Sequence, residues 1–190
     1  MRAQTSVAVN EVLATRRSPR SYDPGYQVSG GDIRAMLEAA RWAPSGMNGQ
    51  PWRFYVGTQG DETYGQILSS LGIFNQKWAK NASLLILVAS TTVKADGTPN
   101  NDYLFDCGLA VSQLVFEAHD RGLIAHQMAG FDKSDASKAL SMPDELTPVI
   151  VVAIGKQDSP DKLDAALAER EVAPRVRLPL EEIVIKGLPL

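Results

Sequence analysis

The segment RRSPRSY, which begins at Arg16, concentrates side chains that suit an anionic ligand. It holds Arg16, Arg17 and Arg20 with Ser18 between them, directly after a predicted helix. A guanidinium group binds phosphate oxygens through two parallel hydrogen bonds, and a serine hydroxyl can complete such a shell. A solvated basic turn would have the same composition, so these residues alone leave both interpretations open.

A second segment, APSGMNGQPW, begins at Ala43 and combines two prolines and two glycines with Ser45, Asn48 and Gln50. Side-chain amides present a donor and an acceptor together, which suits a heterocycle that alternates carbonyls and ring nitrogens. Proline and glycine also set the turn geometry of an ordinary helix-to-strand connection. The segment therefore predicts either a ring-binding loop or a plain connection.

Two further segments could contribute to a binding site. HQMAGFD begins at His126, and its small residues Ala129 and Gly130 allow backbone amides to approach a flat ligand closely. A lone histidine such as His126 is more often a hydrogen-bonded structural side chain than a general base. In the tail, Arg175 and Arg177 point the same way if the chain is extended, so they could clamp an anion or form the outer face of an edge strand.

The chemistry that the sequence lacks is also informative. It contains no Ser-His-Asp pattern, no P-loop and no nucleic-acid module, and no Cys or His grouping has metal-ligand spacing. We therefore expect no metal site and no catalytic side chain. This pattern favours an enzyme whose cofactor carries the chemistry.

Composition limits the class of protein. A net charge of −3 and a pI near 5.4 give no electrostatic footprint for nucleic acid. The single cysteine, Cys107, excludes an internal disulfide, favours a reducing compartment and is expected in the core. The N-terminal residues lack the apolar run of a signal peptide, and the apolar stretches 84–89 and 149–154 are too short to span a bilayer. We expect a cytoplasmic protein with no membrane partner.

The hydrophobic pattern predicts a single domain, residues 1–190, that mixes helices and strands. Helices are predicted at residues 6–15, 29–43, 61–71, 102–121, 134–140 and 160–171. Strands are predicted at residues 53–58, 83–91, 123–128 and 148–155. The uneven order of these elements and the absence of G-x-G-x-x-G argue against a Rossmann domain and favour an α+β sandwich.

Two elements suggest a second subunit. The helix at 102–121, closed by Gly122 as a C-terminal cap, is apolar around most of its circumference. Such a helix is either central or covered by another chain. The tail, residues 174–190, places apolar side chains among prolines and charges without a helical or strand period. It could pack on a second subunit or on its own chain.

Taken in order, these four segments resemble the FMN-dependent nitroreductase family over nearly the whole chain. RRSPR followed by APSGMNGQPW is the most specific part of the resemblance. The resemblance implies a mixed or antiparallel sheet flanked by helices, in an intertwined homodimer with FMN at the interface. It also implies ping-pong transfer of hydride from NAD(P)H through FMN to a nitroaromatic, quinone or related small acceptor.

The resemblance implies where the phosphate of FMN binds. Arg16, Arg17 and Ser18 would contact the phosphate and the ribityl chain. Arg175 and Arg177 would close on the phosphate from the tail. An FMN phosphate carries close to two negative charges, so arginines from two distant segments are a sensible counter-charge.

The resemblance also implies contacts to the flavin ring. Arg20 would lie beside the pyrimidine edge and stabilise the negative charge of the reduced ring, because an arginine cannot lose its proton. Asn75, in FNQKW, matches a family asparagine near the same ring. The opposite subunit would supply Pro44, Ser45, Gly46 and Asn48. The other face of the ring would be lined by Gln127, Met128, Ala129 and Gly130, with a backbone N–H near the hydride-accepting nitrogen.

The chain departs from the family pattern in two places. Many members carry an acidic residue where this chain has Ala129, so any contact there must be made by backbone. Residues 91–102 contain no obvious aromatic lid, from which we hypothesise an open pocket and broad acceptor use. Alternatives are a specialised reaction on the same fold, such as dehalogenation, semialdehyde or enone reduction, or flavin breakdown, and a non-catalytic flavin-binding or sensing protein.

Overall fold

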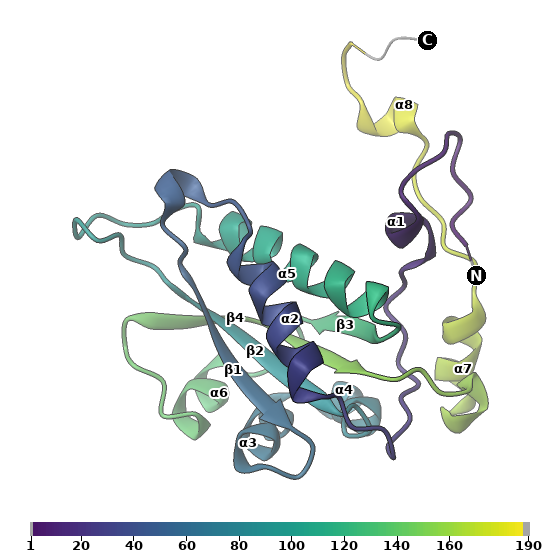
Figure 1. The fold of residues 1–190 in the computed structure, drawn as a ribbon, viewed down its shortest axis with the longest axis horizontal. Coiled ribbons are helices and arrows are strands. Elements are labelled where there is room, and N and C mark those ends of the chain that lie inside the picture. The colour runs from purple at the N-terminus through teal and green to yellow at the C-terminus, as the bar shows by residue number, and fades with distance from the viewer. Residues whose placement is uncertain (1, 188–190) are drawn as a thin grey trace.

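Four antiparallel strands form one sheet in the order β1-β2-β4-β3 in the computed structural model, which describes residues 2–187 (Figure 1). The strands are β1 (Trp52–Thr58), β2 (Leu84–Thr91), β3 (Ile124–Met128) and β4 (Leu146–Gly155). The helices are α1 (Glu11–Thr15), α2 (Gly30–Arg41), α3 (Glu62–Ser70), α4 (Ile73–Ala79), α5 (Tyr103–Asp120), α6 (Lys133–Ala139), α7 (Ala165–Val172) and α8 (Leu180–Ile183). The short 3₁₀ turns are η1 (Gly46–Asn48) and η2 (Pro160–Lys162). The predicted α+β sandwich is confirmed. The expected sheet is mixed or antiparallel, and all three strand pairs of the described residues are antiparallel.

Strand β2 shows why both faces of the sheet are covered. Successive side chains of a strand point to opposite faces, and the β2 residues on both faces are fully buried. Leu85 and Leu87 pack in the cluster that includes side chains of α3, α4 and α6. Leu84 and Ile86 pack in the cluster that includes α2 and α5. The sheet is therefore the middle of three layers (Figure 1).

Apart from α8, a short helix of the tail that the sequence pattern does not predict, three helices differ from the predicted pattern for local reasons. Helix α1 begins at Glu11 rather than at residue 6, because the side chain of Asn10 caps it by accepting a hydrogen bond from the Val12 amide at 3.0 Å. The predicted helix 160–171 is divided into η2 and α7, and Asp164 caps α7. Helix α4 is not predicted, since it is one of the shortest and has no side-chain cap.

Helix α5 is close to its predicted extent, and Gly122 follows it with a φ of 69° that suits glycine. Cys107 is fully buried on this helix, so its predicted place in the core is confirmed. Leu104 and Phe105, at the N-terminal end of α5, are exposed to 55% and 70%. The predicted burial all round the helix therefore does not hold within one chain.

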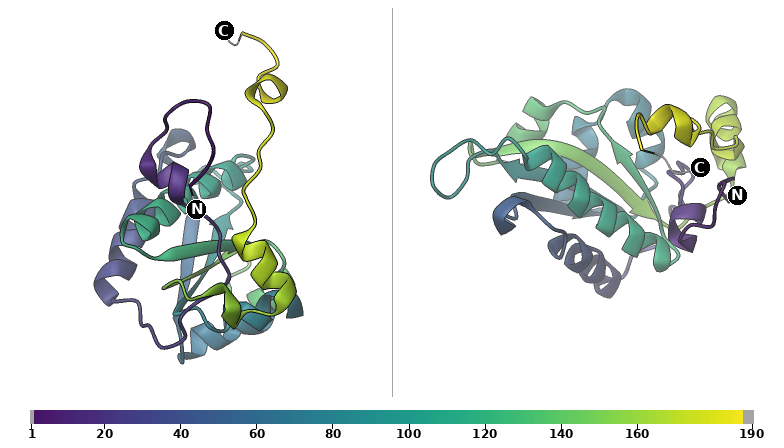
Figure 2. Two further views of the ribbon diagram at one scale, coloured as in Figure 1. Left: turned by 90° about the vertical axis from the view of Figure 1, so that its right-hand side faces the viewer. Right: turned by 90° about the horizontal axis from the view of Figure 1, so that it is seen from above.

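The N-terminal residues and the C-terminal tail run side by side outside the sandwich (Figures 1 and 2). After α7 the chain extends along the α1 side and includes the short helix α8. Val176 and Ile185 in this tail are exposed to 80% and 91%. Residues 188–190 of the predicted tail lie outside the described residues. Among the described helices, none has the length and apolar character needed to cross a membrane.

Candidate functional site

Arginines from the two ends of the chain meet beside α1. Arg175 donates hydrogen bonds to the carbonyl oxygens of Arg16 and Ala14. Burial, and next the charge of Arg177, lowers the pKa of Arg16. Burial, and next the charges of Arg16, Arg17 and Arg177, likewise lowers the pKa of Arg175. Four positive charges are therefore concentrated in one region of the molecule.

Three of these arginines form no ion pair within residues 2–187, although Glu181 lies in the lining of the cavity that they share. The three are Arg16, Arg175 and Arg177. The hydrogen bonds from Arg16 to the Arg17 carbonyl and the Ser18 hydroxyl are both long, at 3.4 Å. The three arginines line a cavity of about 610 Å³ between the N-terminal segment and the tail. Such a cavity favours an anion with more than one charge.

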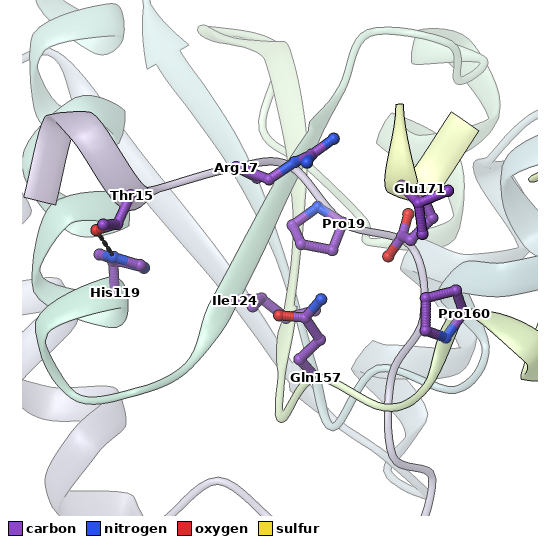
Figure 3. Close-up of a pocket in the computed structure, with 9 residues that line it drawn as sticks. Thr15, Arg17, Pro19, His119, Ile124, Gln157, Pro160 and Glu171 are labelled. Carbon is purple, nitrogen blue, oxygen red and sulfur yellow. Dashed lines mark hydrogen bonds between the residues drawn. The ribbon is translucent and has the colours of Figure 1, made fainter. Parts of the chain in front are cut away.

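Arg17 lies on the other side of the segment from Arg16, because successive residues of an extended chain face opposite ways. Its Nη2 donates to the Ala173 carbonyl at 2.7 Å, and its side chain lines a second cavity of about 280 Å³ (Figure 3). Ser18 lies on the Arg16 side, with its hydroxyl 3.5 Å from Oε1 of Gln127. Of the predicted phosphate contacts, Arg17 therefore faces α7 rather than the first cavity.

Arg20 packs against a buried aromatic cluster. Its Cζ lies 5.9 Å from the ring centroid of Trp78, which also contacts the rings of His126 at 4.7 Å and Tyr22 at 6.2 Å between centroids. Burial, and next the charge of Arg20, lowers the pKa of His126 to about 4. The imidazole is then neutral at pH 7, and its Nδ1, 3.0 Å from the Pro19 carbonyl, is the donor in that contact. The Nε of Arg20 is buried and has no hydrogen-bond partner in the described residues, which a bound ligand could supply.

Asn75 and the end of β3 form an edge next to the arginine segment. The Asn75 side-chain amide donates to the Gly130 carbonyl at 3.2 Å, and a Cβ at position 130 would come within 3.2 Å of the same nitrogen. Met128 is buried, Gln127 is half-buried, and Ala129 and Gly130 are exposed. Since Gln127 also approaches the serine of the arginine segment, the edge and the segment form one surface.

The loop between α2 and β1 has a strained backbone. Met47, Asn48 and Gln50 have φ values of 52°, 55° and 45°, in the left-handed region that disfavours most side chains. The Gly46 amide donates to Oδ1 of Asp106, a buried carboxylate on α5, at 3.2 Å. Strain that the surrounding structure maintains is common in binding loops.

Helix α5 separates this loop from the arginine cluster. Its N-terminal end holds the loop through Asp106, and near its C-terminal end His119 Nε2 lies 2.8 Å from the Thr15 hydroxyl, beside Arg16. At 1.5 Å per residue, Asp106 and His119 are about 20 Å apart. Figure 1 shows the loop and α1 at opposite ends of α5. The predicted residues on the loop are therefore not brought to the arginines of their own chain: Pro44, Ser45, Gly46 and Asn48.

Three side chains that shape the site are not among the predicted residues: Trp78, Asp106 and Glu171. Trp78 lies three residues after Asn75, about one helical turn. A helix through Asn75 would therefore place Trp78 on the same face. Glu171 lies at the end of the predicted helix 160–171, four residues after Leu167, and shares its buried face. No sequence signal distinguishes Asp106 from an ordinary acidic residue in the first turn of a helix.

The sequence profile of the nitroreductase family matches residues 13–71 and 66–156. An uncharacterized 15.4 kDa protein in the ask 5′ region of Mycolicibacterium smegmatis is 39% identical over 143 residues, which cover 71% of this chain and 95% of that protein. An oxygen-insensitive NADPH nitroreductase of Helicobacter pylori is 32% identical over 80 residues, 42% of this chain and 37% of that protein. A solved structure described as an oxidoreductase containing FMN is 36% identical with a TM-score of 0.92, covering 98% of this chain and 95% of that one.

Proposed function

The chain belongs to the nitroreductase family, and we propose that it is an NAD(P)H-dependent oxidoreductase that uses FMN to reduce small oxidised molecules. The similar solved structure is described as containing FMN, and the Helicobacter pylori relative is named an NADPH nitroreductase. When bound, FMN supplies the redox chemistry by taking a hydride from the nicotinamide and passing it to the acceptor. The residues of this chain bind and orient that cofactor.

The observation that carries the proposal is the convergence of Arg16, Arg175 and Arg177 on one cavity. None of the three forms an ion pair within residues 2–187, and the single carboxylate of the lining, Glu181, leaves a net positive charge. A phosphate group carries about 1.5 to 2 negative charges at pH 7. Each charge-assisted hydrogen bond to it contributes about 1.5–3 kcal/mol. We therefore assign the FMN phosphate to this cavity, with Ser18 as a further donor.

We assign the flavin ring to the surface formed by Arg20, Asn75 and residues 127–130. The buried, unpartnered Nε of Arg20 fits a carbonyl or nitrogen at the pyrimidine edge. A guanidinium keeps its charge at any working pH, so Arg20 stabilises the negative charge that the flavin gains on reduction.

No side chain of the site is assigned as an acid, base or nucleophile. His126 is neutral at pH 7, and its Nδ1 is already bonded to the Pro19 carbonyl. Cys107 is fully buried, and burial raises the pKa of its thiol. The proposal therefore gives the protein two tasks, which are to hold FMN and to stabilise its reduced form.

We further propose that the chain acts as a homodimer and that the loop at residues 43–50 completes the site of the partner subunit. The separation of about 20 Å along α5 supports this arrangement. So do the exposed apolar side chains beside the loop, with Met47 and Phe105 exposed to 100% and 70%. The apolar side chains of the extended tail would pack on the partner subunit as well.

The acceptor is proposed by class, as a nitroaromatic, a quinone or an enone. Residues 91–102 form a small exposed turn with a bridge between Val93 and Pro99. The turn itself contains no aromatic side chain. Without an aromatic lid at this turn, the pocket would admit oxidised substrates of varied shape. The single cysteine fits a reducing compartment, and we propose a cytoplasmic location.

An anaerobic titration tests the function directly. The purified protein should show a flavin absorbance spectrum that NADH or NADPH bleaches, and a nitroaromatic or quinone should then restore the colour. Bound flavin that neither nicotinamide bleaches would contradict the proposal and favour a non-catalytic flavin-binding protein.

A further inference from the structure

Glu171 is a buried carboxylate that the proposed function does not use. It lies in the last turn of α7 and is 8% exposed. Within residues 2–187 it forms none of the ion pairs found there. A buried carboxylate is unfavourable unless other polar groups satisfy it, so its partners indicate what it does.

Those partners are the backbone amides that follow Pro19. Oε1 of Glu171 accepts hydrogen bonds from the Arg20 amide at 2.9 Å and the Ser21 amide at 3.1 Å, and Oε2 lies 3.0 Å from the Arg20 amide. Figure 3 shows the side chain extending from α7 toward the segment that carries Pro19. The carboxylate thus holds the peptide of Arg20 and leaves the guanidinium free of it.

The other side of the same peptide is held by His126. Its Nδ1 donates to the Pro19 carbonyl, and its ring contacts Trp78, over which the Arg20 guanidinium lies. Glu171 and His126 together fix the backbone on both sides of Arg20. The remaining freedom of the guanidinium is limited by the Trp78 ring.

We propose that Glu171 is a positioning residue that sets the place of the Arg20 guanidinium beside the flavin. This inference rests on the proposed function. Glu171 lies beyond residue 156, where the match to the family profile ends, so the contact belongs to the C-terminal segment of this chain. Loss of the carboxylate would let the Arg20 peptide move and would weaken the interaction of its side chain with the reduced flavin.

The test compares Glu171→Gln with Glu169→Gln. Both changes remove one negative charge from α7, but the Glu169 side chain is exposed and forms no side-chain hydrogen bond or ion pair within residues 2–187. The new side chain of the Glu171→Gln variant keeps only one acceptor oxygen. Its NH₂ group then faces the backbone amides of Arg20 and Ser21, from which it cannot accept a hydrogen bond. FMN should bind about tenfold more weakly to the Glu171→Gln apoprotein, and the midpoint potential of the bound flavin should fall. The Glu169→Gln protein should match the wild type in both.

A double-mutant cycle separates positioning from general stability. In an Arg20→Met background, Glu171→Gln should change FMN affinity less than twofold, because the residue through which Glu171 acts is gone. The same tenfold loss in both backgrounds, or wild-type affinity and potential in Glu171→Gln, would overturn the inference. If Glu171→Gln does not fold, Glu171→Asp keeps the charge but shortens the reach, and it should lower affinity and potential in the same direction. Wild-type protein that binds no FMN would instead refute the proposed function.

Discussion

If one chain completes the site of its partner, two variants that each lose FMN binding should restore one site when they are paired. Arg16→Ala removes a proposed phosphate contact and leaves the loop at 43–50 intact. Asn48→Asp changes the loop and leaves the arginines intact, and aspartate tolerates the φ of 55° at this position. Each variant alone should bind FMN at least tenfold more weakly, for the loss of one charged contact or one amide donor.

The expected recovery follows from the distance along α5. Because about 20 Å separate the two regions within a chain, an Arg16→Ala/Asn48→Asp heterodimer has both changes in one site and neither in the other. Heterodimers isolated through two different affinity tags should therefore bind about one FMN per dimer at a concentration where each homodimer binds almost none.

Flavin absorbance after titration of the apoproteins gives the stoichiometry. The matched control is an Arg16→Ala/Arg177→Ala heterodimer, in which each site keeps one change because both residues belong to the same region. This control should show no recovery. If the Arg16→Ala/Asn48→Asp heterodimer binds no more FMN than the control, the loop and the arginines do not belong to different subunits, and the proposed interface site is wrong.

Three further predictions concern single residues. Arg177→Ala should weaken FMN binding by about 10- to 100-fold in a fluorescence titration without changing Tm, since its hydrogen bond in the described residues is to the adjacent Val176 carbonyl; an unchanged Kd would remove it from the phosphate site. Cys107→Ser should lower the free energy of unfolding, measured in urea, by about 1 kcal/mol, because the thiol packs in the apolar core. Flavin occupancy and turnover should not change, and loss of turnover in a folded protein would contradict this. The pKa of His126 is lowered to about 4, mainly by burial and next by the charge of Arg20. Its contribution to stability is therefore complete above its unfolded pKa of about 6.5 and is lost as pH falls toward 4, by about 3 kcal/mol in all; urea unfolding of His126→Gln should show a flatter pH dependence over this range, and an equal slope would refute the assignment.

The elements that the sequence predicts well are those with strong local signals. The apolar run at β2 and the apolar helix α5 with Gly122 after it are found within a few residues of their predicted positions. The predicted helix at 29–43 begins where Ser29 caps α2, with its hydroxyl accepting from the Asp32 amide at 3.0 Å. Each of these signals depends on neighbouring residues, so no long-range contact is needed to interpret it.

The parts that could not be predicted depend on contacts between distant residues. Composition groups Arg17 with Arg16, but the structure turns it toward the Ala173 carbonyl, 156 residues away. If the chain is extended, Arg16 and Arg17 must face opposite ways. The sequence does not say which of the two faces the C-terminal tail. The four-residue spacing from Leu167 places Glu171 on the buried face of α7, but it cannot identify its partners, which are backbone amides 150 and 151 residues away.

These distant contacts explain why the arginine cluster requires the C-terminal segment. Arg175 donates to the carbonyls of Ala14 and Arg16, the Ala173 carbonyl accepts from Arg17, and Glu171 accepts from the Arg20 amide. The segment after β4 therefore holds the backbone at Arg16 and Arg20, whose side chains we assign to FMN. In the proposed site, one short stretch of chain, residues 171–175, thus holds both Arg16 at the phosphate and the peptide of Arg20 at the flavin. A displacement of α7 should consequently weaken phosphate binding and lower the flavin potential together, whereas a displacement of the loop at 43–50 should affect the site of the partner subunit.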